Sequence, residues 1–242
     1  MAQTTGTLRI GTSGYQYDHW RGTFYPDDLP RSRWFDYYAE RFDTVELNNT
    51  FYGLPKPATA AHWREAAPDG FLYAVKFSRY GSHVKRLREP ESLLQRFLEP
   101  VRELGEHLGP ILVQLPPRWK PRPQRLDAFL QAAPRDLRWA VELRDPGWLR
   151  EEVYAVLAEH GAALCLHDML PDHPWRLTAS WTYVRYHGDH YAGGYSREQL
   201  AGDARRLNQW RAQGHDVYAY FNNDAEGHAV HDAATLRELM LA

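Results

Sequence analysis

Five charged side chains in this 242-residue chain could serve small-molecule chemistry, and each lies within or at the end of a short apolar segment. Lys76, Arg144 and Arg185 are cations, which suit an anionic ligand. Glu46 and Glu142 are embedded in apolar runs, where burial raises a carboxyl pKa and a nearby cation lowers it. We expect the cations to bind an anion and the carboxylates to exchange protons. The alternative is that each arginine pairs with a neighbouring carboxylate, as Arg144 with Glu142.

Lys76 and two further residues, His187 and Cys165, bear on catalysis. His187 belongs to YVRYHG (residues 183–188) and is the best histidine candidate for acid–base work. Lys76 is also a catalytic candidate, because a buried lysine can form a Schiff base, although pairing with a carboxylate is its commoner role. Cys165, the only cysteine, lies between two leucines, which indicates a small core residue rather than a nucleophile.

The expected ligand-binding residues can orient hydroxyl groups or hold an anion. They are Tyr15, Asn48, Tyr52, Gln114, Arg144, Asp168, Arg185, Asn222 and Asn223. With the backbone amides of residues 11–14, they suit a small anionic, hydroxyl-rich ligand such as a sugar phosphate or a carboxylate. Because sugar faces pack on aromatic rings, four rings are expected to wall the site. These rings are Tyr15, Trp20, Tyr52 and Trp148.

A divalent-metal site is the main rival interpretation. Its candidate ligands are Glu142, His167, Asp168, His187 and Asp224. Against it, no HxH or HExxH spacing occurs, and Arg144 and Arg185 would crowd a dication. No cofactor is therefore expected, and a bound divalent metal stays the alternative.

The elements that must position these residues alternate between short strands and longer helices. Strands are predicted over residues 8–11, 44–47, 72–77, 111–115, 139–143, 163–167, 182–187 and 217–221. Helices are predicted over residues 33–41, 58–66, 91–107, 123–132, 149–160, 196–213 and 226–241. Between His167 and Trp181 the helical period is missing, so the connection between strands six and seven is degenerate.

This alternation predicts one α/β domain over residues 1–242, a (β/α)8 TIM barrel. The competing architecture is an open doubly wound sheet. The first turn, GTSGY at residues 11–15, matches neither of the glycine-rich phosphate motifs of such sheets. In TIM barrels chemistry takes place at the carboxyl ends of the strands, and each predicted strand becomes polar there.

Several motifs in fixed order carry a family resemblance. They are GTSGY (11–15), WRGTFYP (20–26), VELNNTFY (45–52), LVQLPP (112–117), ELRDPGW (142–148), YVRYHG (183–188) and YFNND (220–224). Over about residues 8–229 the chain resembles the DUF72 family, also called YecE-like proteins, a family of unknown function. The resemblance implies a TIM barrel, and its signature positions coincide with most of the strand-end residues named above. Tyr15 departs from the pattern, since relatives commonly carry Trp there.

Composition limits the classes of protein and partner. The chain is 43% hydrophobic and 25% charged, which excludes disordered and low-complexity proteins. The net charge of −2 disfavours a dedicated nucleic-acid binder, although a basic run at residues 79–88 keeps that partner as an alternative. No apolar run is long enough for a membrane span, and the start MAQTTGTLRI lacks the features of a signal peptide. We expect a soluble, cytoplasmic protein without a membrane partner; its oligomeric state is not predicted.

These observations predict an enzyme, a lyase, isomerase or hydrolase, acting at the carboxyl-terminal end of the barrel. Its substrate is expected to be a small anionic, carbohydrate-like or phosphorylated molecule. Two alternatives stay open. One is a metal-dependent phosphodiesterase or endonuclease acting on nucleic acid, and the other is a barrel that binds a ligand without turnover.

Overall fold

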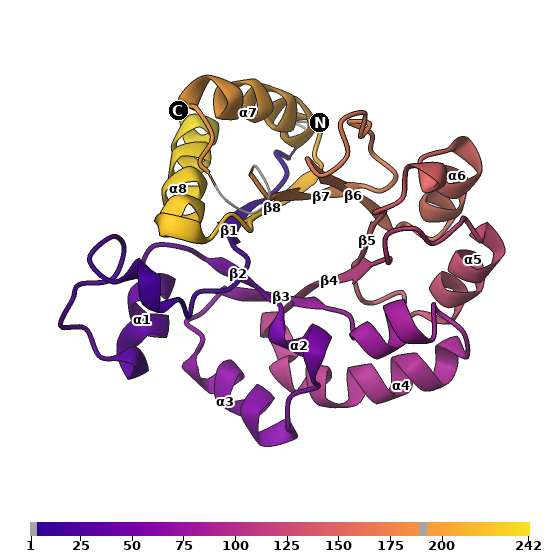
Figure 1. Cartoon of the computed structure of the whole chain (residues 1–242), viewed down its shortest axis with the longest axis horizontal. Helices are drawn as coiled ribbons and strands as arrows, with labels where there is room; N and C mark the ends of the chain where they lie inside the picture. Colours follow the sequence, from indigo (N-terminus) through magenta and orange to yellow (C-terminus); the bar gives the residue numbers. More distant parts are fainter. Residues whose placement is uncertain (1–3, 189–192) are drawn as a thin grey trace.

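The computed structural model describes residues 4–188 and 193–242, and its strands form one parallel sheet in the order β1-β8-β7-β6-β5-β4-β3-β2. The strands are β1 (Leu8–Thr12), β2 (Thr44–Leu47), β3 (Leu72–Lys76), β4 (Leu108–Gln114), β5 (Trp139–Glu142), β6 (Ala163–His167), β7 (Trp181–Tyr186) and β8 (Asp216–Phe221). Strands β1 and β2 stand at the two ends of this order. Just after β1, the N–H of Gly14 donates to the carbonyl of Glu46 on β2 over 2.9 Å. This contact nearly closes the sheet into a barrel, which confirms the predicted fold (Figure 1).

Helices surround the barrel (Figure 1). They are α1 (Trp34–Ala39), α2 (Asn49–Tyr52), α3 (Pro57–Ala66), α4 (Pro90–Val101), α5 (Pro123–Ala132), α6 (Glu151–Glu159), α7 (Arg197–Ala212) and α8 (His228–Leu241). Short helical turns lie at η1 (Asp18–Trp20), η2 (Arg31–Arg33), η3 (Tyr80–Val84), η4 (Arg102–His107), η5 (Pro146–Trp148) and η6 (Ala225–Gly227). The helices cover the strands' outer faces, so the strands are buried on both sides, as their continuous apolar runs predict.

Several helix boundaries differ from the sequence prediction by a residue or two, and two of the differences coincide with residues of positive φ. The predicted helix over residues 91–107 ends as α4 at Val101 and continues as η4, in which Gly105 adopts a φ of +56° that a continuous α-helix does not allow. The predicted helix over residues 226–241 begins at His228, because Glu226 and Gly227 both have positive φ. In contrast, α7 begins where its sequence indicates, with a capping box between Ser196 and Gln199.

The barrel interior is filled by small side chains on some strands and large rings on others. Ala74, Ala140 and Ala163 leave space for Tyr183 and Tyr220, whose ring centroids are 5.0 Å apart. This apolar layer closes the barrel below the polar residues, which follow one inward-facing position further along the strands. The polar side chains named here thereby lie at the end of the barrel formed by the strands' carboxyl ends, which we call the mouth.

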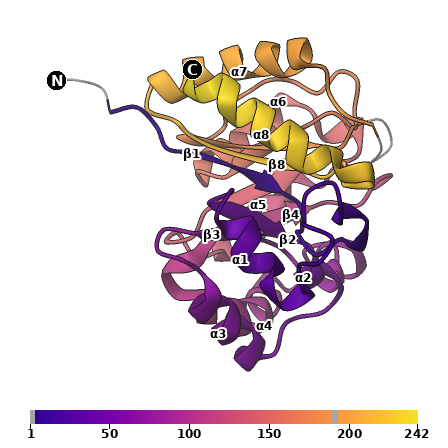
Figure 2. The ribbon, with the colours of Figure 1, turned by 90° about the vertical axis from the view of Figure 1, so that its left-hand side faces the viewer.

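Strand register brings the mouth residues together. Gln114 on β4 pairs in register with Glu142 on β5, and His167 on β6 with Arg185 on β7. In Figure 2 strand β1 points away from the N terminus, so the mouth lies at the opposite end of the barrel. Within residues 4–188 and 193–242, no helix combines the length and the apolar character needed to cross a membrane.

The β6–β7 connection lacks a helix. Residues 168–180 cross the outside of these two strands as an irregular segment, as the sequence predicts (Figure 1). The next helix along the chain, α7, follows β7 instead. The outer faces of β6 and β7 are therefore covered by a loop and one neighbouring helix. Each of the other connections between consecutive strands contains a packed helix.

Candidate active site at the mouth of the barrel

Arg185 occupies the centre of the mouth, where it is 1% exposed and bound to two carboxylates. Its Nη1 donates to Oε2 of Glu142 over 2.7 Å, and its Nη2 donates to Oε1 of Glu46 over 2.8 Å. The three residues come from β7, β5 and β2, whose inward-facing positions converge on the barrel axis. Buried charges are costly unless paired, and these are paired. Arg185 thus holds two carboxylates, as the ion-pair alternative predicts, and its contact with a ligand anion stays a prediction.

Glu46 is fully buried and accepts hydrogen bonds from three residues. Tyr183 donates its hydroxyl to Oε2 over 2.6 Å, and the Ser13 hydroxyl and Arg185 donate to Oε1. Burial by itself would raise the pKa of Glu46. The charges of Arg185 and Lys76 and the hydrogen bonds from Ser13 and Tyr183 outweigh burial, so the pKa is lowered.

Glu142 is held in the same way on the other side of Arg185. Gln114 donates from Nε2 to Oε1 of Glu142 over 2.8 Å, and Nε of Arg144 donates to the same oxygen. Burial would raise the pKa of Glu142, but the charges of Arg185 and Arg144 hold it well below its usual range. Glu46 and Glu142 are therefore fixed carboxylates at neutral pH. This geometry counts against the expectation that they exchange protons.

His187 follows β7 and links the mouth to Asp168. Its Nδ1 lies 2.9 Å from Oδ1 of Asp168, while Nη1 of Arg185 and Nη2 of Arg144 each lie 3.1 Å from Nε2. Guanidinium groups can only donate, so Nε2 accepts and the imidazole proton lies on Nδ1. Burial, reinforced by the Arg185 and Arg144 charges, lowers the pKa of His187 below its ordinary value against the opposing effect of Asp168. His187 is therefore a neutral imidazole oriented by a carboxylate.

Asp168 is fixed by donors from the segment after β7. The backbone N–H of His187 lies 3.0 Å from Oδ2, and the N–H of Gly188 donates to the same oxygen over 3.2 Å. The hydroxyl of Tyr195 donates to Oδ2 as well. Burial would raise the pKa of Asp168, but its bonds to His187 and Tyr195 lower it. Asp168 thus acts on the site through His187.

Lys76 of β3 differs from the other cations of the mouth. It is 8% exposed, and its Nζ lies 4.5 Å from the centre of the Phe51 ring. Across the residues that the structure describes, Nζ forms no hydrogen bond or ion pair. Burial, followed by repulsion from Arg185, lowers the pKa of Lys76 to about 8, although Glu142 and Glu46 act in the opposite direction.

The amide of Asn48 lies at the same end of the barrel. Its Nδ2 donates to the Ser13 hydroxyl over 2.5 Å, while its Oδ1 is buried and accepts no hydrogen bond from the described part of the chain. Asn222 is half-buried and continues the inward alternation of Tyr218 and Tyr220. In contrast, Asn223 is fully buried and donates to Asp232 over 2.8 Å, so it joins β8 to α8 rather than facing a ligand.

Three of the four rings expected to wall the site are buried in the core, and the fourth, Tyr52, lies beside Phe51 with ring centroids 5.1 Å apart. Trp20 and Trp148 are fully buried and donate their indole N–H groups to backbone carbonyls. Tyr15 packs against Phe35, with ring centroids 5.4 Å apart. Tyr52 is 82% exposed, because α2 turns it toward solvent. The ring that lies next to the Lys76 ammonium is that of Phe51, which sequence reasoning did not single out.

The donor set does not form a metal site among the described residues. No group of three or more His, Cys, Asp or Glu side chains there is arranged to hold a metal ion. His167 uses both ring nitrogens, since Nε2 lies 2.9 Å from the Leu143 carbonyl and Nδ1 accepts from the N–H of Met169. The oxygens of Glu142 are occupied by arginine and glutamine donors. These residues therefore do not fit the predicted alternative of a dication held by Glu142 and His167.

Sequence reasoning missed Ser13, Tyr183 and Tyr195 as parts of the site. For Ser13 and Tyr183 a signal existed: each lies two residues from an inward-facing position on its own strand, Gly11 and Arg185 respectively. Tyr195 lies outside any strand and has no such periodic signal.

Comparisons with known proteins agree on one family. A family model described as "Protein of unknown function DUF72" matches residues 9–242. The UPF0759 protein YecE of Escherichia coli K12 is 37% identical over 110 residues, which are 45% of this chain and 40% of that protein. The match thus spans less than half the length of this relative. The UPF0759 protein YunF of Bacillus subtilis is 24% identical over 271 residues, 96% of this chain and 94% of the relative.

Solved structures give the same result for the fold. A DUF72 family protein from Thermotoga maritima has a TM-score of 0.87 and 27% identity, covering 98% of this chain and 100% of that one. A 3-keto-D-glucoside 4-epimerase of Escherichia coli has a TM-score of 0.53 and 15% identity, covering 98% of this chain and 100% of that one. This second likeness is one of fold alone.

Proposed function

The chain belongs to the DUF72 family, and from the residues at the mouth of its barrel we propose an enzyme that acts on a small hydroxylated anion. One observation carries the proposal: the buried ammonium of Lys76 has no hydrogen-bonded counter-ion among the described residues. The nearby carboxylates, Glu46 and Glu142, are already bound to Arg185. A phosphate or carboxylate of the substrate would supply the missing partner.

Electrostatics supports an anionic ligand. The lowered pKa of Lys76, about 8, means that burial and the arginines penalise its charge more than the carboxylates stabilise it. An anion next to Nζ would remove that penalty, and part of its binding energy would come from this relief. Near pH 7 the lysine is still mainly protonated, so the anion-binding form is the main one.

Polar groups beside Lys76 support a hydroxylated ligand. The free Oδ1 of Asn48 accepts a hydrogen bond and is too buried to be left without a donor at no cost. Gln114 and the half-buried Asn222 add amide groups at the same end of the barrel. Sugar phosphates and sugar acids combine an anion with several hydroxyl donors, so they match this set of groups.

Proton transfer is assigned to His187. The Nε2 lone pair of its neutral, buried imidazole accepts from Arg185 and Arg144 and can take a substrate proton once these donors turn to the substrate. Asp168 stabilises the imidazolium that then forms. Both arginines that now donate to Nε2 can donate to a substrate oxygen instead. This chemistry suits an isomerase or a lyase that removes and returns a proton. Lys76 is then a binding group, and Glu46 and Glu142 hold the arginines in place.

The test is a binding screen with four probes: glucose 6-phosphate, gluconate, neutral glucose and inorganic phosphate. We expect the two hydroxylated anions to raise the melting temperature of the wild-type protein and glucose to have no effect. Lys76→Met should abolish the shift, whereas Lys56→Met, at an exposed lysine, should keep it. Equal shifts in wild type and Lys76→Met would contradict the proposal.

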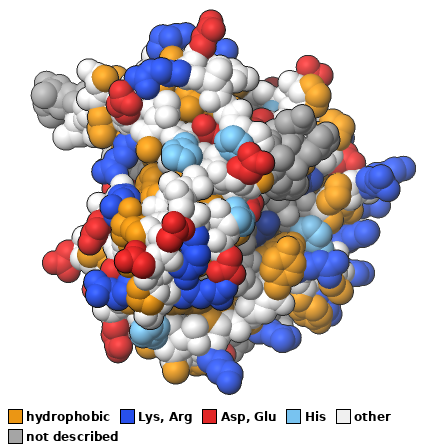
Figure 3. Space-filling view, turned by 60° about the vertical axis from the view of Figure 1, so that its left-hand side comes forward, with side chains coloured by type: hydrophobic (Ala, Val, Ile, Leu, Met, Phe, Trp, Pro, Cys, Tyr) orange, Lys and Arg blue, Asp and Glu red, His pale blue; other side chains and the backbone are white. Residues whose placement is uncertain are grey.

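A second candidate function, action on nucleic acid, has one observation in its favour. Basic side chains from the loops after β3 and β4 and from the start of α5 line a hollow beside Trp119: Arg86, Arg118, Lys120, Arg122 and Arg125. Figure 3, in which the mouth faces right, shows Lys and Arg side chains along that edge. Steep salt-dependent binding of a DNA duplex would support this candidate, and binding that is absent at 50 mM salt would remove it.

A cytoplasmic location also stays a prediction.

A further inference from the structure

Lys76 lacks the partner that a buried lysine commonly has. Buried lysines usually pair with a carboxylate, but the carboxylates whose charges act on Lys76, Glu142 and Glu46, are bound to Arg185 instead. In the part of the chain that the structure describes, Nζ of Lys76 forms no hydrogen bond and no ion pair. The nitrogen is therefore available for bonding to a ligand.

The surroundings of Nζ favour the uncharged amine. The Phe51 ring lies 4.5 Å from Nζ, and the Thr50 hydroxyl donates to the Lys76 carbonyl over 2.7 Å, which fixes the end of β3 against α2. Burial next to the Arg185 cation lowers the pKa of Lys76 to about 8, so near pH 8 the ammonium and the neutral amine are both well populated. Desolvation beside a second cation is one way in which a lysine becomes a nucleophile toward carbonyl groups.

We infer that Lys76 forms an imine with a 2-oxo acid, a molecule whose carbonyl carbon is bonded to its carboxylate carbon. The inference rests on the proposed function and narrows its substrate class, because the carboxylate is the anion bound at the mouth. One nitrogen serves both as counter-ion and as nucleophile, so the carbonyl must be close to the anionic group. The iminium that forms is positively charged, and the carboxylate therefore keeps a cationic partner after the reaction.

The atoms and charges of this step balance without a further reactant. The ammonium gives one proton to solvent, and its nitrogen lone pair adds to the carbonyl carbon while an N–H proton moves to the oxygen. The hydroxyl so formed takes a proton back from solvent and leaves as water, and the nitrogen lone pair forms the C=N bond. One water is released, and the net charge of the site is unchanged.

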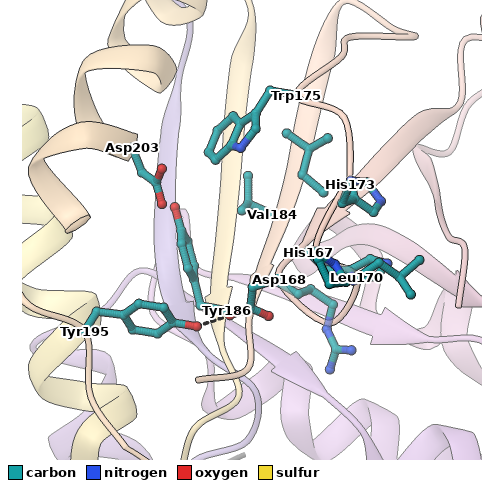
Figure 4. Close-up of a pocket in the computed structure, with 12 residues that line it drawn as sticks. His167, Asp168, Leu170, His173, Trp175, Val184, Tyr186, Tyr195 and Asp203 are labelled. Carbon is teal, nitrogen blue, oxygen red and sulfur yellow. Dashed lines mark hydrogen bonds between the residues drawn. The ribbon is translucent and has the colours of Figure 1, made fainter. Parts of the chain in front are cut away.

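An iminium gives His187 a proton that a weak base can remove. Figure 4 shows the Tyr195 hydroxyl bound to Asp168, the carboxylate that orients the neutral imidazole of His187. A C–H bond next to an iminium carbon is more acidic than one next to a carbonyl, because its electrons move toward a positively charged nitrogen. The proton passes to Nε2 of His187, and the C–H electron pair forms the C=C bond of a neutral enamine. Return of a proton to the enamine completes an isomerisation.

The test is reductive trapping of the wild-type protein at pH 8 with pyruvate and sodium cyanoborohydride, followed by mass spectrometry of the intact chain and its peptides. We expect one reduced pyruvyl group per chain, on Lys76. The internal control is Lys85, whose Nζ donates to Glu89 over 2.9 Å and which should react at least ten times more slowly. Lactate, which has a hydroxyl in place of the carbonyl, should leave the chain unlabelled.

Two variants separate the imine from anion binding. Lys76→Arg keeps a positive charge but has no amine, so it should lose the label and keep the rise in melting temperature caused by gluconate. Lys56→Arg, at an exposed lysine, should be labelled like the wild type. Because the label is mapped in the wild-type protein, the result does not depend on the folding of a variant.

The imine and the proposed function can fail separately. A label that is absent from Lys76, or that is spread equally over the lysines, would overturn the imine. If gluconate still stabilises the protein in that case, the anion-binding function stands. A label on Lys76 without stabilisation by either hydroxylated anion would support the imine and overturn the anion-binding function.

Discussion

The Nη1 atom of Arg185 lies 2.7 Å from Oε2 of Glu142, and the pair spans the interior of the barrel from β7 to β5 with no exposure to solvent beyond 1%. With Glu46 on the other side of the guanidinium, the network joins three strands that are far apart in sequence. Its members therefore stabilise the barrel and fix the arginine geometry of the mouth at the same time.

Removing Arg185 should destabilise the fold strongly. Arg185→Met leaves two buried carboxylates without their shared cation, so the free energy of unfolding should fall by about 3–5 kcal/mol. Urea unfolding followed by circular dichroism measures the change. The matched control is Arg197→Met, whose partner Glu238 forms an ion pair at 60% and 65% exposure, and it should change stability by less than about 1 kcal/mol. Equal losses in the two variants would contradict this account.

The pKa of Glu142 should be visible in an acid titration. Its pKa is lower in the folded than in the unfolded chain, so its stabilising contribution is full above the unfolded value of 4.5 and is lost as pH falls through the folded value. Carbon-13 NMR of the glutamate carboxyls should show that Glu46 and Glu142 titrate below the ordinary value of 4.5. A titration of either residue above pH 5 would contradict the assigned network.

Lys76 should lower the stability of the ligand-free protein, although it serves to bind the anion. Its folded pKa of about 8 lies below the ordinary 10.5, so the folded state binds fewer protons between these values and stability should rise with pH across that window. Lys76→Met should raise the free energy of unfolding at pH 7 by about 1–3 kcal/mol. Urea titrations at pH 7 and pH 10 measure both effects. A Lys76→Met protein that is destabilised at pH 7, or whose gain over wild type does not shrink from pH 7 to pH 10, would show that the ammonium is well paired.

The proton of His187 should lie on Nδ1 because Asp168 accepts it. Nitrogen-15 NMR should report this neutral tautomer across pH 6 to 8. In Asp168→Asn the pKa of His187 should fall further, because the group that raises it is gone. His62→Gln, at a residue on α3, is the control that should leave the His187 signals in place. A wild-type His187 that is protonated at pH 7 would rule out its role as a base.

Much of this site could be predicted, because in a parallel barrel each strand delivers its last inward-facing residue to the same end. That rule brings Glu46, Lys76, Glu142 and Arg185 together from sequence alone. It does not give their partners, since Arg185 and Glu46 are 139 residues apart and a strand pattern carries no information about which charges pair. The exposure of Tyr52 was not predicted either, because it depends on the short helix α2.

The charge on Lys76 offers the most direct test of the proposed function. If a bound anion becomes its partner, the pKa of Lys76 rises on binding, and at pH 8 the complex takes up protons from the buffer. Gluconate is the suitable probe because it does not titrate near pH 8, and calorimetry in two buffers of different ionisation enthalpy counts the protons. We predict that the wild-type protein takes up part of one proton per gluconate and that Lys76→Met neither binds nor takes up protons. Gluconate binding without proton uptake, or with the same uptake in Lys76→Met, would contradict the role of Lys76.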